Sequence, residues 1–75
     1  MDRHVPARLD WIVRFVAAFR ADTGVAPSLG WLVEYSQPRV SETTIQRDLA
    51  ALLQSGGLRR VRIGRVNYYE VSHAK

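Results

Sequence analysis

The sequence contains no cysteine, which excludes a disulfide framework and any metal site built from thiolates. Its two histidines, His4 and His73, lie near opposite ends of the chain, whereas a zinc site or a catalytic site needs a cluster of such side chains. The sequence also lacks a glycine-rich phosphate loop, a pair of carboxylates in a shared motif and a nucleophile with an adjacent base. It therefore predicts a protein that is not an enzyme, with no cofactor, no metal and no small-molecule ligand.

Long hydrophobic runs are absent too. No apolar run approaches the roughly 20 residues of a membrane-spanning helix, and the start of the chain shows no signal peptide. We expect a cytoplasmic protein without a membrane partner, associated with the nucleoid if its source is a bacterium, a phage or an archaeon. The 75 residues predict a single domain over 1–75, and its core is thin because folding at this size buries only about 60% of the unfolded surface.

Positive charge is concentrated in one part of the chain. The net charge is +4, and residues 39–68 carry six arginines against two acids, while the remaining residues balance five against five. A basic footprint of this kind favours a polyanionic partner. The alternative is a basic, solvated face that serves only solubility.

The spacing of the apolar residues predicts helices over about 6–22, 29–36 and 42–55. In the third, Ile45, Leu49, Leu52 and Leu53 share one side, and Thr43, Arg47, Ala50, Ala51 and Gln54 share the opposite side. Residue types that favour helix ends stand at the boundaries: Pro6, Ser28, Pro38, Ser41 and either Gly56 or Gly57.

In the last segment of the sequence, the apolar residues recur at every second position. Residues 58–71 predict a β-hairpin with a type II′ turn at Gly64-Arg65, and a short third strand is expected near Val25-Ala26. Val61, Ile63, Val66 and Tyr68 are expected on or near one face, with Arg60, Arg62, Arg65 and Asn67 pointing outward or at the tip. The fold class is thus α+β: a small winged helix-turn-helix of three helices followed by a two-stranded wing.

Two stretches carry a family resemblance. "APSLGWLVEYS" and "VSETTIQRDLAAL" resemble the N-terminal DNA-binding domain of LexA-type repressors, and the second is also similar to the DeoR-type helix-turn-helix. The likeness runs from about Leu9 to Val71, and it implies that 42–55 is a recognition helix. Its most specific residues are Val40, Ser41, Thr44, Ile45, Arg47, Asp48 and Leu49.

The chain also departs from that family. The connection "SQPR" is longer than usual and lacks a glycine, Leu53 stands where a polar residue is common, and two glycines follow the third helix instead of one. LexA-type repressors carry a self-cleaving peptidase domain, and the resemblance does not extend to it. That activity is therefore not implied.

In a winged helix-turn-helix, the recognition helix enters the major groove. Arginine can hydrogen-bond guanine and glutamine can hydrogen-bond adenine. Alternatively, Arg47 contacts a phosphate and reads no base, and Thr44 only hydrogen-bonds the backbone of its own helix. The expected base contacts are Glu42, Thr43, Thr44, Gln46 and Arg47. The expected contacts to the DNA backbone are Ser28, Arg39, Ser41, Arg60, Arg62, Arg65 and Asn67.

Two of these groups have a second interpretation. The Ser41 hydroxyl can cap its own helix, and arginines on an exposed strand can protect the hairpin from aggregation. For Arg59, the sequence favours neither DNA contact nor protection of the strand edge.

One domain reads only a few base pairs, so we expect self-association on DNA or through the first helix. The candidate surface comprises Trp11, Val13 and Phe15, whose alternative role is in the core of a monomer.

These patterns predict sequence-specific binding of double-stranded DNA by a small transcriptional regulator, most simply a repressor. One alternative is an architectural DNA-binding protein, excisionase-like or associated with replication. The other is a winged-helix module that binds proteins and not DNA.

Overall fold

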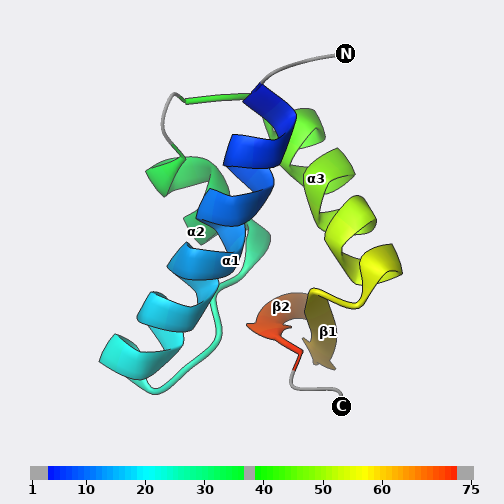
Figure 1. The fold of residues 1–75 in the computed structure, drawn as a ribbon. Helices are drawn as coiled ribbons and strands as arrows, with labels where there is room; N and C mark the ends of the chain where they lie inside the picture. Colours follow the sequence, from blue (N-terminus) through cyan, green and yellow to red (C-terminus); the bar gives the residue numbers. More distant parts are fainter. Residues whose placement is uncertain (1–3, 37–38, 73–75) are drawn as a thin grey trace.

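The computed structural model describes residues 4–36 and 39–72, with side chains from residue 7 onward. Three helices are followed by a two-stranded antiparallel hairpin, which confirms the predicted α+β order (Figure 1). In Figure 1, α1 runs between α2 and α3, and the hairpin lies beside the C-terminal end of α3. The elements are α1 (His4–Thr23), α2 (Leu29–Tyr35), α3 (Glu42–Ser55), β1 (Leu58–Ile63) and β2 (Val66–Val71).

α2 and α3 begin directly after Ser28 and Ser41, and α3 ends before Gly56, as predicted. α1 starts two residues before the predicted position, so Pro6 stands in its first turn, and α2 ends one residue early. At the end of α3, Gly56 takes the left-handed conformation (φ 85°), and the Gly57 N–H donates to the Leu52 carbonyl at 2.9 Å. This geometry satisfies the last carbonyls of the helix and turns the chain into β1.

Every helix and strand contributes to one core. The pattern of α3 works as predicted, because its apolar side is buried and Thr43, Arg47, Ala50, Ala51 and Gln54 are exposed. The buried apolar residues are Ile12, Val16, Leu32, Ile45, Leu49, Leu52, Leu58 and Tyr69.

The expected third strand lies elsewhere. Val25 and Ala26 form no strand; instead, Ser28 makes an isolated antiparallel bridge to Tyr68, and the Tyr69 N–H donates to the Pro27 carbonyl at 2.9 Å. The Val25 backbone is held by Thr23, whose hydroxyl accepts from the Val25 N–H at 3.3 Å. Pairing therefore starts only after this turn, and it fixes β2 to the N-terminal end of α2.

The hairpin has the predicted register, with Ile63 opposite Val66 on either side of the turn. Gly64 has a φ of 64° and Arg65 a negative φ, the combination that a type II′ turn requires. Val61, Ile63, Val66 and Tyr68 share one face, as predicted, but Ile63 is 66% exposed because the tip extends beyond the core. The core is reached from the other face, through Leu58 and Tyr69.

Five aromatic rings lie between α1 and α2. Trp11 stacks on Phe15 with centroids 5.1 Å apart, and Phe15 stacks on Tyr35 at 5.7 Å. Trp11, Val13 and Phe15, the expected self-association surface, are half-buried and pack against the core. Trp31, whose apolar character fits either the core or the surface, lies at one end of this cluster and is 46% exposed.

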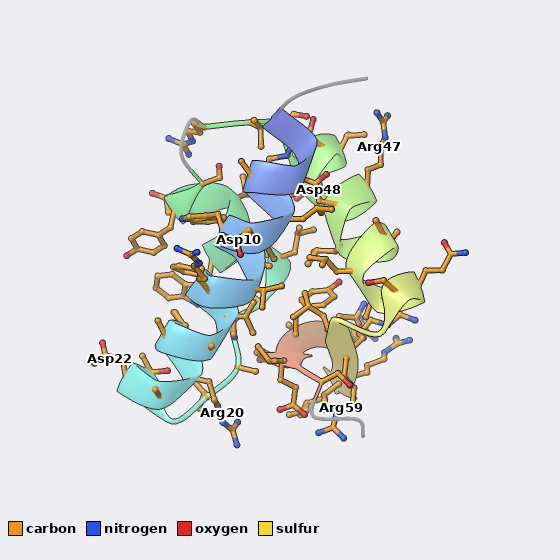
Figure 2. The ribbon with its side chains drawn as sticks, viewed as in Figure 1. Asp10, Arg20, Asp22, Arg47, Asp48 and Arg59 are labelled. Atoms are coloured by element: carbon orange, nitrogen blue, oxygen red, sulfur yellow. The ribbon has the colours of Figure 1, made fainter. Side chains whose placement is uncertain are left out.

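A buried ion pair joins α1 to α3. The Arg8 guanidinium forms a two-pronged pair with the Asp48 carboxylate: Nε donates to Oδ2, and Nη2 donates to Oδ1 at 3.2 Å. The Asp48 side chain is only 5% exposed, and Figure 2 shows it on the side of α3 that faces α1. In the described part of the chain, no helix is long and apolar enough to cross a membrane.

We expect Asp48→Ala to lower the free energy of unfolding by about 3 kcal/mol, because it removes the buried carboxylate from the two-pronged pair with the mostly buried Arg8 guanidinium. The whole domain is worth only roughly 4–11 kcal/mol, so urea denaturation should show the loss clearly. The matched control is Asp10→Ala, which breaks the exposed 3.0 Å pair with Arg14 and should cost under about 0.5 kcal/mol. Equal losses in the two variants would contradict the role given to Asp48.

Candidate nucleic-acid interface

The outer side of α3 presents a continuous polar stripe. Thr43, Gln46, Arg47, Ala50 and Gln54 are all exposed, and their spacing of three or four residues places them along one side of the helix. Figure 2 shows Arg47 extending away from the body of the protein near the N-terminal end of α3. The small Ala50 side chain leaves the middle of this stripe open to close approach by a ligand.

The first turn of α3 is held by its own side chains. The Ser41 hydroxyl accepts a hydrogen bond from the Thr44 N–H at 3.2 Å, and its oxygen lies 3.0 Å from the Thr44 hydroxyl. Ser41 therefore caps the helix, and Thr44 is half-buried against that cap. Both residues were predicted to contact DNA; in the structure their polar groups already have partners within the protein. Glu42, beside them, is exposed.

The connection between α2 and α3 depends on Ser36, which sequence reasoning missed. Ser36 is 4% exposed; its hydroxyl donates to the Val33 carbonyl at 3.1 Å and accepts from the Val40 N–H at 3.3 Å. One buried hydroxyl thus ties the end of α2 to the residue that precedes the Ser41 cap. The helical pattern does not predict this pair of hydrogen bonds, because a serine at this position indicates only the end of a helix. Pro38, the predicted helix breaker, lies outside the described residues.

Four exposed arginines surround this part of the surface without acidic partners. Arg47 lies on α3, and Arg60, Arg62 and Arg65 lie on the hairpin. Among the described residues, none of the four is in an ion pair, and Arg62 Nε donates only to the Gly64 carbonyl at 3.2 Å. Their charge is therefore available to an anionic ligand.

Two other arginines of the basic segment are already paired. Arg59 pairs with its cross-strand neighbour Glu70. Arg39, a predicted contact to the DNA backbone, pairs with Glu34 at 3.3 Å on the exposed surface. An exposed pair of this kind is weak, so Arg39 stays able to exchange its partner for a phosphate.

A shallow pocket joins α3 to the hairpin. It has a volume of about 310 Å³ and brings together four predicted contact residues from different elements. Ser28 precedes α2 and its side chain makes no capping hydrogen bond, Gln46 comes from α3, Arg65 from the turn, and Asn67 from β2. The fold therefore gathers residues that lie up to 39 positions apart into one polar surface.

Acidic side chains lie mainly on the opposite part of the molecule. Asp10 and Asp22 are exposed on α1 and Glu34 is exposed on α2, and Figure 2 shows the first two far from Arg47. Of the exposed α3 residues only Glu42 is acidic, because Asp48 is buried against Arg8. Among the described residues, Arg20 on α1 is also exposed and in no ion pair, but the other arginines of this kind lie together on α3 and the hairpin.

No group of three or more potential metal ligands occurs among the described residues. Comparisons of the chain with protein-family models, with curated proteins and with solved structures found no match. A proposal for its function therefore rests on the geometry and chemistry of its own residues.

We expect Ser41→Ala to lower the free energy of unfolding by about 1 kcal/mol, because an unsatisfied N–H is left at the first turn of α3. Ser41→Asn should retain most of the stability, since its side-chain oxygen can accept the same hydrogen bond. Thr43→Ala, on the exposed side of the same turn, is the control for stability. Thermal denaturation of the three variants measures these changes in stability. A Ser41→Ala protein as stable as the wild type would show that the cap contributes nothing.

Proposed function

We propose that this protein is a winged helix-turn-helix that binds double-stranded DNA in a sequence-specific way and acts as a small transcriptional regulator, most simply as a repressor. One observation carries the proposal. The exposed polar stripe of α3 and the unpaired arginines of the hairpin adjoin each other, joined by the pocket that Gln46 and Arg65 both line.

In the proposed complex, α3 lies in the major groove of B-DNA, which is wide enough to admit one helix. The residues nearest its N-terminal end reach the base edges. Arg47 hydrogen-bonds the two acceptors of a guanine, Gln46 an adenine, and the Thr43 methyl contacts a thymine methyl. The Arg8–Asp48 pair contributes indirectly, because it fixes the rotation of α3 and so the direction in which Arg47 projects.

The hairpin supplies contacts that do not depend on base sequence. Arg60 and Arg62 share one face of β1 with Asn67 of β2, and that face continues from the pocket beside Gln46. These side chains bind phosphates, and Arg65 at the turn reaches the backbone or the minor groove. The regulator then blocks a promoter by occupying it.

We expect a labelled random-sequence duplex to bind this protein with a log–log salt slope near −4, corresponding to about four phosphate contacts. Arg62→Ala/Arg65→Ala should weaken the binding and reduce the magnitude of the slope by about 2. Fluorescence anisotropy at several salt concentrations measures both quantities. Arg14→Ala removes one positive charge from an exposed position on α1 and is the control for a change in net charge alone. Absence of binding at low salt, or an equal effect of Arg14→Ala, would contradict the proposal.

Base recognition by Arg47 is tested after selection of a preferred site from a random pool. We expect Arg47→Ala to weaken binding to that site by about 1–3 kcal/mol and to relax selectivity at one base pair, while binding to random DNA changes less. A phosphate contact gives a different result: equal weakening on both duplexes and a salt slope smaller by about 1. That second pattern would remove Arg47 from base readout.

A further inference from the structure

Four of the five large apolar residues that are exposed in the described part of the chain form two separate patches, and the fifth, Val25, lies in the connection between α1 and α2. Trp31 and Tyr35 lie on α2 and are 46% and 50% exposed, while Ile63 and Val66 lie at the end of the hairpin and are 66% and 43% exposed. Exposed apolar surface that gathers in patches marks a site of association. Neither patch has a role in the DNA complex proposed above.

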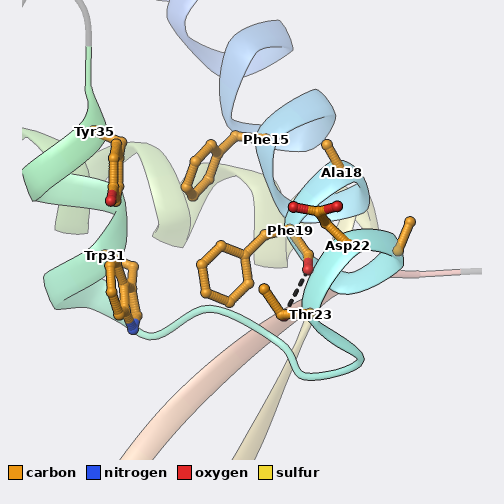
Figure 3. A pocket seen from close by; sticks show the side chains of 8 residues that line it. Phe15, Ala18, Phe19, Asp22, Thr23, Trp31 and Tyr35 are labelled. Atoms are coloured by element: carbon orange, nitrogen blue, oxygen red, sulfur yellow. Dashed lines mark hydrogen bonds between the residues drawn. The ribbon is translucent and has the colours of Figure 1, made fainter.

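The first patch, which we call the aromatic groove, lies between α1 and α2 and is lined by Phe15, Phe19, Trp31 and Tyr35 (Figure 3). Trp31 stacks on Tyr35 with centroids 5.6 Å apart, and Phe19 contacts Trp31 at 5.5 Å. The groove has a volume of about 730 Å³ and is wide open to solvent. The rings hold one another in place, so the apolar wall exists before any partner binds.

The rim of the groove is acidic. Asp22, from the last turn of α1, lines the groove, and among the described residues it is in no ion pair. Its neighbour Thr23 is fixed by a hydrogen bond from its hydroxyl to the Phe19 carbonyl at 2.7 Å, drawn dashed in Figure 3. An occupant must therefore combine an apolar group for the rings with a positive charge for the carboxylate.

The second patch, the hairpin tip, has that combination. It comprises Ile63, Gly64, Arg65 and Val66, and Ile63 and Val66 are direct cross-strand partners. Ile63 projects from the face of β1 opposite to the one that carries Arg60 and Arg62. The tip can therefore insert its apolar pair into a groove while the arginine face of the hairpin stays on DNA.

We propose that the hairpin tip of one copy docks into the aromatic groove of a second copy. Ile63 packs against Trp31 and Tyr35, and Arg65 lies near Asp22 or over an aromatic face, where a cation is attracted. A contact between two grooves is disfavoured, because it would bring two Asp22 carboxylates together in an apolar surround. Charge complementarity thus selects the tip of another copy as the occupant.

This contact is heterologous, because the two surfaces that meet are different parts of the chain. The pair as a whole keeps one free groove on one copy and one free tip on the other, so further copies can add in a row unless the rotation closes a ring. The contact does not rest on DNA binding and is tested without DNA.

The test uses two variants that each remove one side of the contact. The tip variant, Ile63→Ser/Val66→Ser, removes the apolar pair and keeps all charges. The groove variant, Trp31→Lys, adds a positive charge that repels the basic tip, and Asp22→Lys does the same without touching the ring cluster. Sedimentation velocity up to millimolar concentration measures association, and circular dichroism confirms the fold of each variant. Arg14→Ala is the surface control.

We expect the wild type to associate progressively with concentration, and each single variant to weaken association by about tenfold or more, the loss expected at the centre of a contact. A mixture of tip variant and groove variant should recover association and stop at a one-to-one dimer, because one intact tip and one intact groove remain. The proposal is overturned if the wild type stays monomeric, if the tip variant associates like the wild type, or if the mixture remains monomeric.

Discussion

The ion pair between Arg8 and Asp48 is the contact that fixes how α3 is presented. Successive residues of a helix project about 100° apart, so a rotation of α3 that exposed Asp48 would draw Arg47 toward the core. Such a rotation would break the two-pronged pair between Asp48 and the mostly buried Arg8 side chain, at a cost of several kcal/mol. The inward position of Asp48 therefore determines the outward position of Arg47, and the exposure of the polar stripe of α3 depends on the ion pair with Arg8.

The hairpin divides into two parts with different physical tasks. Its base is held by Leu58 and Tyr69 in the core and by the hydrogen bond from Tyr69 to Pro27. Its tip lies beyond the core, and there Ile63 and Val66 have no covering element. A hairpin that served only to shield its own edge would need polar residues at these two positions. Apolar residues at the tip make sense if another surface covers them.

The local features of this fold are readable in the sequence, and the long-range ones are not. The helix bounds and the Gly64-Arg65 turn follow from Ser41, Gly56 and the change of apolar period, all of which act over a few residues. The Arg8–Asp48 pair spans 40 positions, and no periodicity connects them.

The candidate site divides in the same way. The stripe with Gln46 and Arg47 was predicted because one helix defines it, and the cap formed by Ser41 was one of the two predicted roles of that residue, because a cap also acts over a few residues. The aromatic groove could not be predicted, because the apolar pattern of α2 leaves Trp31 open to the core or the surface, and only the structure shows that its ring is half exposed. A domain this small covers few base pairs, so its proposed DNA affinity is limited by the size of one interface. A head-to-tail contact would raise the local concentration of each neighbour on the duplex, which multiplies weak affinities without new base contacts. Ile63 projects from the hairpin face opposite to Arg60 and Arg62. In a row of copies on DNA, these two arginines can therefore stay on phosphates while Arg65, at the tip, contacts either the DNA or the neighbouring copy.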